Sequence, residues 1–92
     1  MKTERRAILF SGQVQGVGFR YTAVQLSRDL RLGGTVRNLP DGRVEMVVEG
    51  AGSEIDEVIS RLREHFGGSI RKVDQDVVPA LGDVGPGIRI VH

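Results

Sequence analysis

Residues 34–49, GTVRNLPDGRVEMVVE, contain the strongest fold signal in this sequence. At their centre, LPDG at 39–42 is typical of a tight turn, because proline presets φ to about −65° and Asp-Gly accommodates positive φ. After the turn, apolar and charged side chains alternate, as they do in a strand with one buried face. The apolar ones are Val44, Met46 and Val48. We therefore predict a β-hairpin whose strands span 34–38 and 43–49.

Upstream of the hairpin, the pattern predicts a strand followed by a helix. Residues 6–14 are rich in β-branched and apolar types, which favours a strand, and a glycine-bearing turn follows at 15–18. Beyond the turn, apolar residues recur every three or four positions, which is the period of a helix with one buried face. These residues are Phe19, Ala23, Leu26 and Leu30. We expect Gly33-Gly34 to end this helix.

Downstream of the hairpin, the same criteria predict a second helix and two more strands. Ser53 is a candidate N-cap, with Asp56 three residues later. The helix that follows is amphipathic, and Gly67-Gly68 ends it. Its apolar positions are Ile55, Val58, Ile59, Leu62 and Phe66. We expect strands at 70–78 and 88–91, separated by a loop at 80–86.

The expected order is therefore β-α-β-β-α-β plus a short C-terminal strand, within a single domain over residues 1–92. This order predicts an α+β, ferredoxin-like split-βαβ sandwich, with both helices on one face of a mainly antiparallel sheet. Because many unrelated activities use this fold, the fold alone does not identify the function.

The composition is that of an ordinary globular domain. Of the 92 residues, 39% are hydrophobic and 27% are charged, with a formal net charge of +1, which indicates no nucleic-acid or membrane partner. The absence of cysteine excludes disulfides, thiolate metal sites and cysteine-nucleophile phosphatases. The apolar run at 7–10 is too short for a signal peptide or a membrane span. We expect a cytoplasmic monomer.

The stretch GQVQGVGFR at 12–20 has the features of an anion site. It leads from a strand, through a turn with two glycines, into a helix. Main-chain N–H groups in such a turn can converge on one point, and the helix N-terminus adds about half a positive charge. Gly16 and Gly18 allow the backbone to approach a ligand closely, and Arg20 can donate paired hydrogen bonds to phosphate oxygens.

On these grounds alone, a tight turn followed by an exposed arginine is an equal alternative. An arginine at a helix N-terminus is disfavoured by roughly a few tenths of a kcal/mol, a penalty that a bound anion relieves. The loop lacks both the Gly-Lys-Ser/Thr of a Walker A motif and the Gly-x-Gly-x-x-Gly of a dinucleotide site.

Two motifs favour the anion site. The stretch 12–20 resembles the first signature of the acylphosphatase family, Gly-x-Val-Gln-Gly-Val-x-Phe-Arg, at every fixed position. The stretch GTVRN at 34–38, followed by Asp41-Gly42 and Val44-Glu45, resembles the second. Their order and separation also match, and the resemblance extends over nearly the whole chain.

The resemblance implies metal-free hydrolysis of acyl phosphates, to a carboxylate and inorganic phosphate, without a cofactor. It implies that Arg20 and Asn38 are catalytic: Arg20 and the loop amides hold the phosphate, and Asn38 orients the attacking water. The implied phosphate-binding residues are Gln15, Gly16, Val17, Gly18, Phe19 and Arg20. The expected partners are a small-molecule acyl phosphate and, as competing anions, inorganic phosphate or sulfate.

The sequence departs from the family pattern in three places. Thr35 stands where the family usually has tryptophan, Gln13 stands where arginine is common, and residues 67–92 match poorly. Neither substitution falls on Arg20 or Asn38. We therefore expect them to affect packing beside Asn38 and substrate preference rather than the chemistry.

Other candidate sites and functions have less support. Asp74-Gln75-Asp76 has the Asp-x-Asp form of some aspartyl-phosphate enzymes, but it lies in a predicted polar edge strand. His65 and His92 lack metal-ligand spacing, so we predict no metal. With three Phe and one Tyr as its aromatic residues, the chain is a poor RNA-binding sandwich. The main rival to a hydrolase is a module that binds carbamoyl phosphate or a phosphorylated partner without efficient turnover.

Overall fold

The computed structural model describes residues 2–82 and 84–92. Met1 and Asp83, the latter within the expected loop 80–86, lie outside the described residues. The elements follow the predicted order. They are β1 (Thr3–Gly12), α1 (Phe19–Leu26), β2 (Leu32–Asn38), β3 (Val44–Ala51), α2 (Gly52–Phe66), a 3₁₀ turn (Gly67–Ser69), β4 (Ile70–Val78) and β5 (Gly87–Ile90).

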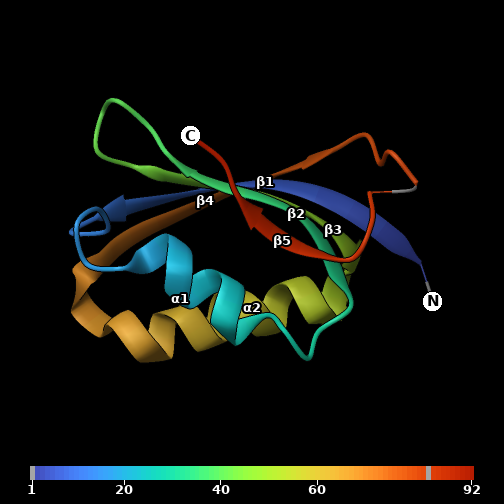
Figure 1. The fold of residues 1–92 in the computed structure, drawn as a ribbon, viewed down its shortest axis with the longest axis horizontal. Helices are drawn as coiled ribbons and strands as arrows, with labels where there is room; N and C mark the ends of the chain where they lie inside the picture. Colours follow the sequence, from blue (N-terminus) through green and yellow to red (C-terminus); the bar gives the residue numbers. More distant parts are fainter. Residues whose placement is uncertain (1, 83) are drawn as a thin grey trace.

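The five strands form one sheet, and both helices pack on one of its faces (Figure 1). The strands lie in the order β4-β1-β3-β2-β5. All neighbours are antiparallel except β2 and β5, which are parallel. These observations confirm the predicted ferredoxin-like α+β sandwich with an additional short strand.

The core lies between the sheet and the two helices. From the sheet, alternate side chains of β1 and β3 point toward the helices and are fully buried, as the alternation in 43–49 predicts. They are Ile8, Phe10, Val44, Met46 and Val48. The helices contribute Phe19, Ala23, Ile55, Val58 and Leu62. Burial of each large apolar side chain is worth about 1.5–3 kcal/mol, so this layer fixes both helices against the sheet.

Helix α1 is shorter than predicted, because it ends at Leu26 rather than continuing to Leu30. The hydroxyl of Ser27 donates a 3.1 Å hydrogen bond to the Val24 carbonyl. The Arg61 guanidinium donates a 2.8 Å hydrogen bond to the Leu26 carbonyl. These two donors satisfy carbonyls that an ending helix leaves free. Leu30 still packs against the core, but from the connection that follows the helix.

The prediction that Gly33-Gly34 ends this helix is also wrong, because both residues lie in β2. Gly34 has φ of +146°, and a Cβ atom there would collide with the main-chain carbonyl of Val47 in β3. Glycine is therefore required here by the close approach of two strands and not by a helix end.

Strand β3 passes directly into α2, so the predicted cap is displaced. Ala51 occupies the N-cap, and Ser53 lies inside the first turn without a side-chain capping bond. The other end of α2 is as predicted, since the helix stops at Phe66 and Gly67 follows with φ of 54°. The first strand also ends before the predicted residue 14, because its register with β4 shifts at Gly12.

Candidate active site

The loop between β1 and α1 presents a row of free main-chain donors. Gly16 and Gly18 both have φ of 77°, a left-handed conformation that glycine adopts without strain. The first main-chain hydrogen bond of α1 joins the Thr22 N–H to the Gly18 carbonyl at 2.9 Å. Within residues 2–82 and 84–92, no main-chain N–H of residues 15–20 donates to a protein acceptor. These groups, at the positive end of α1, are available to an anion.

Phe19 fixes the beginning of α1 to the core. Its ring packs against Phe10 of β1 and stacks on Phe66 of α2, with ring centroids 4.9 and 4.8 Å apart, respectively. Because this side chain is buried, Phe19 can contribute to an anion site only through its main chain. The anchoring also determines the direction in which the side chain of the next residue, Arg20, projects from the helix.

A cavity of about 400 Å³ lies beside this loop and joins the two predicted catalytic residues. Arg20 reaches it from the first turn of α1, and Asn38 reaches it from the last residue of β2. Of the other residues predicted for the site, Gly16, Gly18 and Phe19 line the cavity as well. The fold thus brings the two sequence motifs to one place.

Gln15 and Val17 are not part of the cavity lining. The Gln15 side-chain nitrogen donates hydrogen bonds to the carbonyls of Leu39 and Arg43, at 2.8 and 2.9 Å. It therefore connects the loop to the turn between β2 and β3. The Val17 side chain is half exposed, so both residues can serve an anion only through their main-chain N–H groups.

Sequence reasoning missed Ile90 and His92, which also line the cavity. They arrive there because β5 is parallel to β2, with Ile90 opposite Val36. The last residues of the sequence have too short a pattern to reveal this pairing. Tyr21, the residue after Arg20, lines the cavity too, with a largely exposed side chain.

Arg20 brings a positive side-chain charge to the cavity. None of its described lining residues is acidic, and in the described part of the chain Arg20 forms no ion pair with a carboxylate. Its guanidinium instead contacts the His92 ring, with 3.4 Å between Nη1 and Nδ1. In the adjacent turn, hydrogen bonds from the Arg43 main chain and guanidinium lower the pKa of Asp41 and compensate its charge locally.

The other motifs lie away from the cavity. Asp74 and Asp76 belong to β4, which is an edge strand, as predicted. Among residues 2–82 and 84–92, no three His, Cys, Asp or Glu side chains are grouped as a metal ion would need. None of the described helices is both long enough and apolar enough to cross a membrane.

Comparison with known proteins identifies the family. The family model described as Acylphosphatase matches residues 6–84. The acylphosphatase of Paenarthrobacter aurescens is 40% identical over 83 residues, which cover 89% of this chain and 88% of that protein. The chain belongs to the acylphosphatase family. As a member, it is a hydrolase that acts on the mixed acid anhydride of acyl phosphates.

Solved structures agree with this assignment. The crystal structure of acylphosphatase from Bacillus subtilis superposes with a TM-score of 0.85 at 27% identity, covering 99% of this chain and 100% of that one. HypF from T. kodakarensis superposes with a TM-score of 0.78 at 28% identity. The match covers 97% of this chain but 12% of HypF, so the likeness concerns one part of that larger protein.

The two substitutions within the acylphosphatase motifs lie outside the cavity. Thr35 neighbours Val36, whose side chain is in the core, so Thr35 points to the opposite face of the sheet. Gln13 is exposed, and its main-chain N–H donates to Ser69 at 2.8 Å. Neither residue is part of the lining that contains Arg20 and Asn38.

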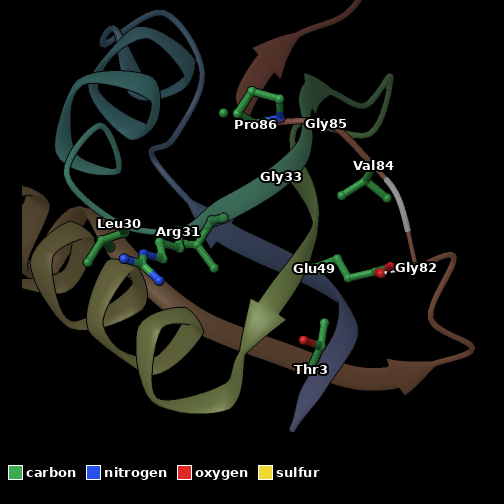
Figure 2. Close-up of a pocket in the computed structure, with 11 residues that line it drawn as sticks. Thr3, Leu30, Arg31, Gly33, Glu49, Gly82, Val84, Gly85 and Pro86 are labelled. Carbon is green, nitrogen blue, oxygen red and sulfur yellow. Dashed lines mark hydrogen bonds between the residues drawn. The ribbon is translucent and has the colours of Figure 1, made fainter. Parts of the chain in front are cut away.

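A larger cavity, of about 500 Å³, lies beside Gly33 at the other end of β2 (Figure 2). In its wall, the Glu49 carboxylate accepts hydrogen bonds from the N–H groups of Leu81 and Gly82, at 2.8 and 2.7 Å. These donors lower the pKa of Glu49, burial opposes them, and the Arg5 guanidinium assists them. Arg31 lines this cavity together with the Glu49 carboxylate, whereas the described lining of the smaller cavity has a cation, Arg20, and no acidic side chain. The smaller cavity is therefore the better candidate for the acylphosphatase site.

Proposed function

We propose that Arg20 and the main-chain N–H groups of residues 15–20 bind the phosphate of an acyl phosphate, and that Asn38 orients the attacking water. The observation that carries this proposal is the cavity itself. It combines a cation, Arg20, with the free N–H groups of the lining residues Gly16, Gly18 and Phe19 and with an amide, Asn38, contributed by a different element.

The arrangement supplies what this reaction needs. Water attacks phosphorus, the bond from phosphorus to the acyl oxygen breaks, the carboxylate leaves with that electron pair, and the proton of the water passes to an oxygen of the phosphate. A carboxylate is a good leaving group, so little acid assistance is required. Preorganised donors neutralise the charge on the phosphoryl oxygens, and catalysis is mainly positioning. The Asn38 amide both accepts and donates hydrogen bonds, which suits it to hold a water molecule but not to deprotonate it.

The proposed substrate is a small-molecule acyl phosphate, and inorganic phosphate and sulfate compete for the same donors. The phosphoryl group would lie between the loop and Arg20, with its acyl group toward the open side near Tyr21. Residues 1–92 would act as one domain. The monomeric state and the cytoplasmic location stay predictions from the sequence.

The test is hydrolysis of benzoyl phosphate in the presence of EDTA, followed by ultraviolet absorbance. Loss of one preorganised donor typically lowers the rate about 10²–10³-fold. Arg20→Ala removes a charge and more than one donor, so its activity should be almost completely lost. Asn38→Ala should lower turnover by a similar factor while inorganic phosphate still inhibits.

Arg63→Ala is the matched control, because Arg63 is an exposed arginine of α2 outside the cavity lining. It should keep the activity of the original chain. A folded chain that binds phosphate but does not hydrolyse benzoyl phosphate would instead be the binding module. If Asn38→Ala abolished phosphate binding and spared turnover, the two roles assigned here would be wrong.

A further inference from the structure

The chain beyond β5 brings a titratable ring into the phosphate cavity. Strand β5 runs parallel to β2, with Ile90 opposite Val36, and the Val91 N–H donates to the Val36 carbonyl at 3.0 Å. Two residues further along the chain, His92 follows Ile90 beyond the end of β5, and Asn38 follows Val36 at the end of β2. Both line the same cavity as Arg20. His92 is therefore held beside the proposed catalytic pair by sheet pairing.

The contact between Arg20 and His92 has only one chemical form. Nη1 of Arg20 lies 3.4 Å from Nδ1 of His92. A guanidinium donates hydrogen bonds and cannot accept them. As a hydrogen bond, this contact requires the ring to accept through Nδ1 and to carry its proton on Nε2, which is the neutral form. A protonated ring has no acceptor to offer, so protonation breaks this contact and places two cations side by side.

Among the described residues, no charged side chain other than Arg20 lines the cavity beside the His92 ring, and in the 92-residue chain the α-carboxylate of His92 itself is a further charge there. Arg37 and Arg89 precede Asn38 and Ile90 on their strands and so point to the opposite face of the sheet. Arg37 pairs there with Glu45 at 2.8 Å. The described residues of the loop 13–18 include no charged side chain. Tyr21 on α1 also lines the cavity.

We infer that His92 is a positioning residue for Arg20 and a pH-dependent part of the anion site. This inference rests on the proposed function, because it takes the cavity to be the phosphate site. When neutral, His92 holds the guanidinium in the cavity before the anion arrives. When protonated, it releases Arg20 and adds a second positive charge next to the bound anion. Histidine is the side chain whose charge ordinarily changes between about pH 5 and 8.

The test measures sulfate binding by titration calorimetry at pH 5.5 and pH 8.0, at constant ionic strength. Sulfate is a dianion at both values, so its own charge does not change, and no turnover is needed. The 92-residue chain used in the test ends in an α-carboxyl group, a class of group that ionises at about pH 3.5 and stays charged throughout. The variants are His92→Asn, which keeps an acceptor without a titratable charge, and His92→Phe, which keeps a ring without an acceptor.

The original chain should bind sulfate about three- to tenfold more tightly at pH 5.5, as expected for one added charge near a dianion in a water-exposed site. His92→Asn and His92→Phe should both lose this gain. At pH 8.0, His92→Asn should bind like the original chain. His92→Phe should bind about two- to tenfold more weakly, because the guanidinium must then be ordered by the anion alone.

Two controls separate the possible failures. His65→Asn removes the other histidine, whose ring packs edge-on against Phe66, and it should keep the full pH response. Arg20→Ala should lose sulfate binding at both pH values. If Arg20→Ala still binds sulfate, the proposed site itself is wrong. If Arg20→Ala loses binding but His92→Asn keeps the pH response, or His92→Phe equals the original chain at pH 8.0, the inference about His92 fails alone.

Discussion

The side-chain amide of Gln15 donates a 2.8 Å hydrogen bond to the main-chain carbonyl of Leu39. The first of these residues belongs to the loop that carries the free N–H groups, and the second directly follows Asn38. The two halves of the proposed site are therefore joined by a side chain that is not part of the cavity lining. Gln15 acts as a connector between them, which its place in the phosphate-binding motif does not reveal.

Removal of this connector should loosen the site. Gln15→Ala loses the hydrogen bonds to Leu39 and Arg43, so the free energy of unfolding should fall by about 1–2 kcal/mol. KM for the acyl phosphate should rise more than kcat falls, because the donors remain present but less well placed. Urea unfolding and steady-state kinetics check both effects. Gln13→Ala, an exposed control, should change stability by less than about 0.5 kcal/mol.

The glycines of the loop provide a second test. Gly18→Ala forces an alanine to adopt φ of 77°, although its Cβ would meet no atom within 4 Å. The cost is therefore purely conformational, about 1–2 kcal/mol. Gly68→Ala is the matched control, since Gly68 also has open space around it but no positive φ.

We expect Gly18→Ala to lower kcat/KM at least tenfold, because relief of the strain rotates N–H groups away from the anion. Gly68→Ala should have no such effect. Equal activities for the two variants would mean that the loop conformation does not matter for phosphate binding.

Glu49 makes stability depend on pH. Its pKa is lowered from 4.5 chiefly by the N–H of Leu81, with further help from Gly82 and Arg5 and against the effect of burial. When the pKa of a carboxyl group is lower in the folded than in the unfolded protein, the group stabilises the fold at pH values above its unfolded pKa. This stabilisation is lost as the pH falls through the folded pKa. The part of stability due to Glu49 should therefore be complete above about pH 5 and disappear in more acidic solution.

The measurement compares thermal midpoints of the original chain and Glu49→Gln at pH 6.5 and pH 3. The variant should unfold several degrees lower at pH 6.5, and the gap should shrink at pH 3. Glu45→Gln is the control, because Glu45 lies on the same strand in an exposed ion pair with Arg37. A gap for Glu49→Gln that did not change with pH would show that its carboxylate charge is not what holds the segment after β4.

Phe19 should matter for stability more than any other residue of the phosphate loop. Phe19→Ala removes a buried ring that contacts Phe10 and Phe66, and such truncations cost about 3–5 kcal/mol. Val17→Ala, which alters a half-exposed side chain two residues earlier, should cost less than about 1 kcal/mol. Denaturant unfolding of both variants would decide, and similar losses would contradict the anchoring role.

The sequence predicts the elements where local chemistry and tertiary packing agree. The hairpin around residues 39–42 has both turn residues and alternation, and α2 has a long apolar period ended by Gly67. The end of α1 could not be predicted in this way, because Leu30 continues the apolar period but is buried from a connection. Gly34 likewise has the local appearance of a helix end, whereas its role is close strand contact.

For the site, the motifs single out Arg20 and Asn38, which line one cavity, but they do not show its remaining walls. Ile90 and His92 arrive through a parallel pairing between β2 and β5, which no short-range pattern encodes. Glu49 is similar, since alternation puts it on the polar side of its strand. Its burial results from the distant residues Leu81 and Gly82, which fold over it.

The position of β1 in the sheet has a consequence for how the chain acquires its structure during synthesis. β1 pairs with β3 from Thr3↔Ala51 and with β4 from Arg5↔Val78. Both pairings therefore form only after β3 and β4 have been synthesised. At about 5–20 residues per second, translation alone imposes a delay of several seconds. The phosphate loop directly follows β1, so it does not reach its final conformation until β1 has paired. Sulfate should therefore slow unfolding of the finished domain in stopped-flow experiments while leaving its refolding rate almost unchanged.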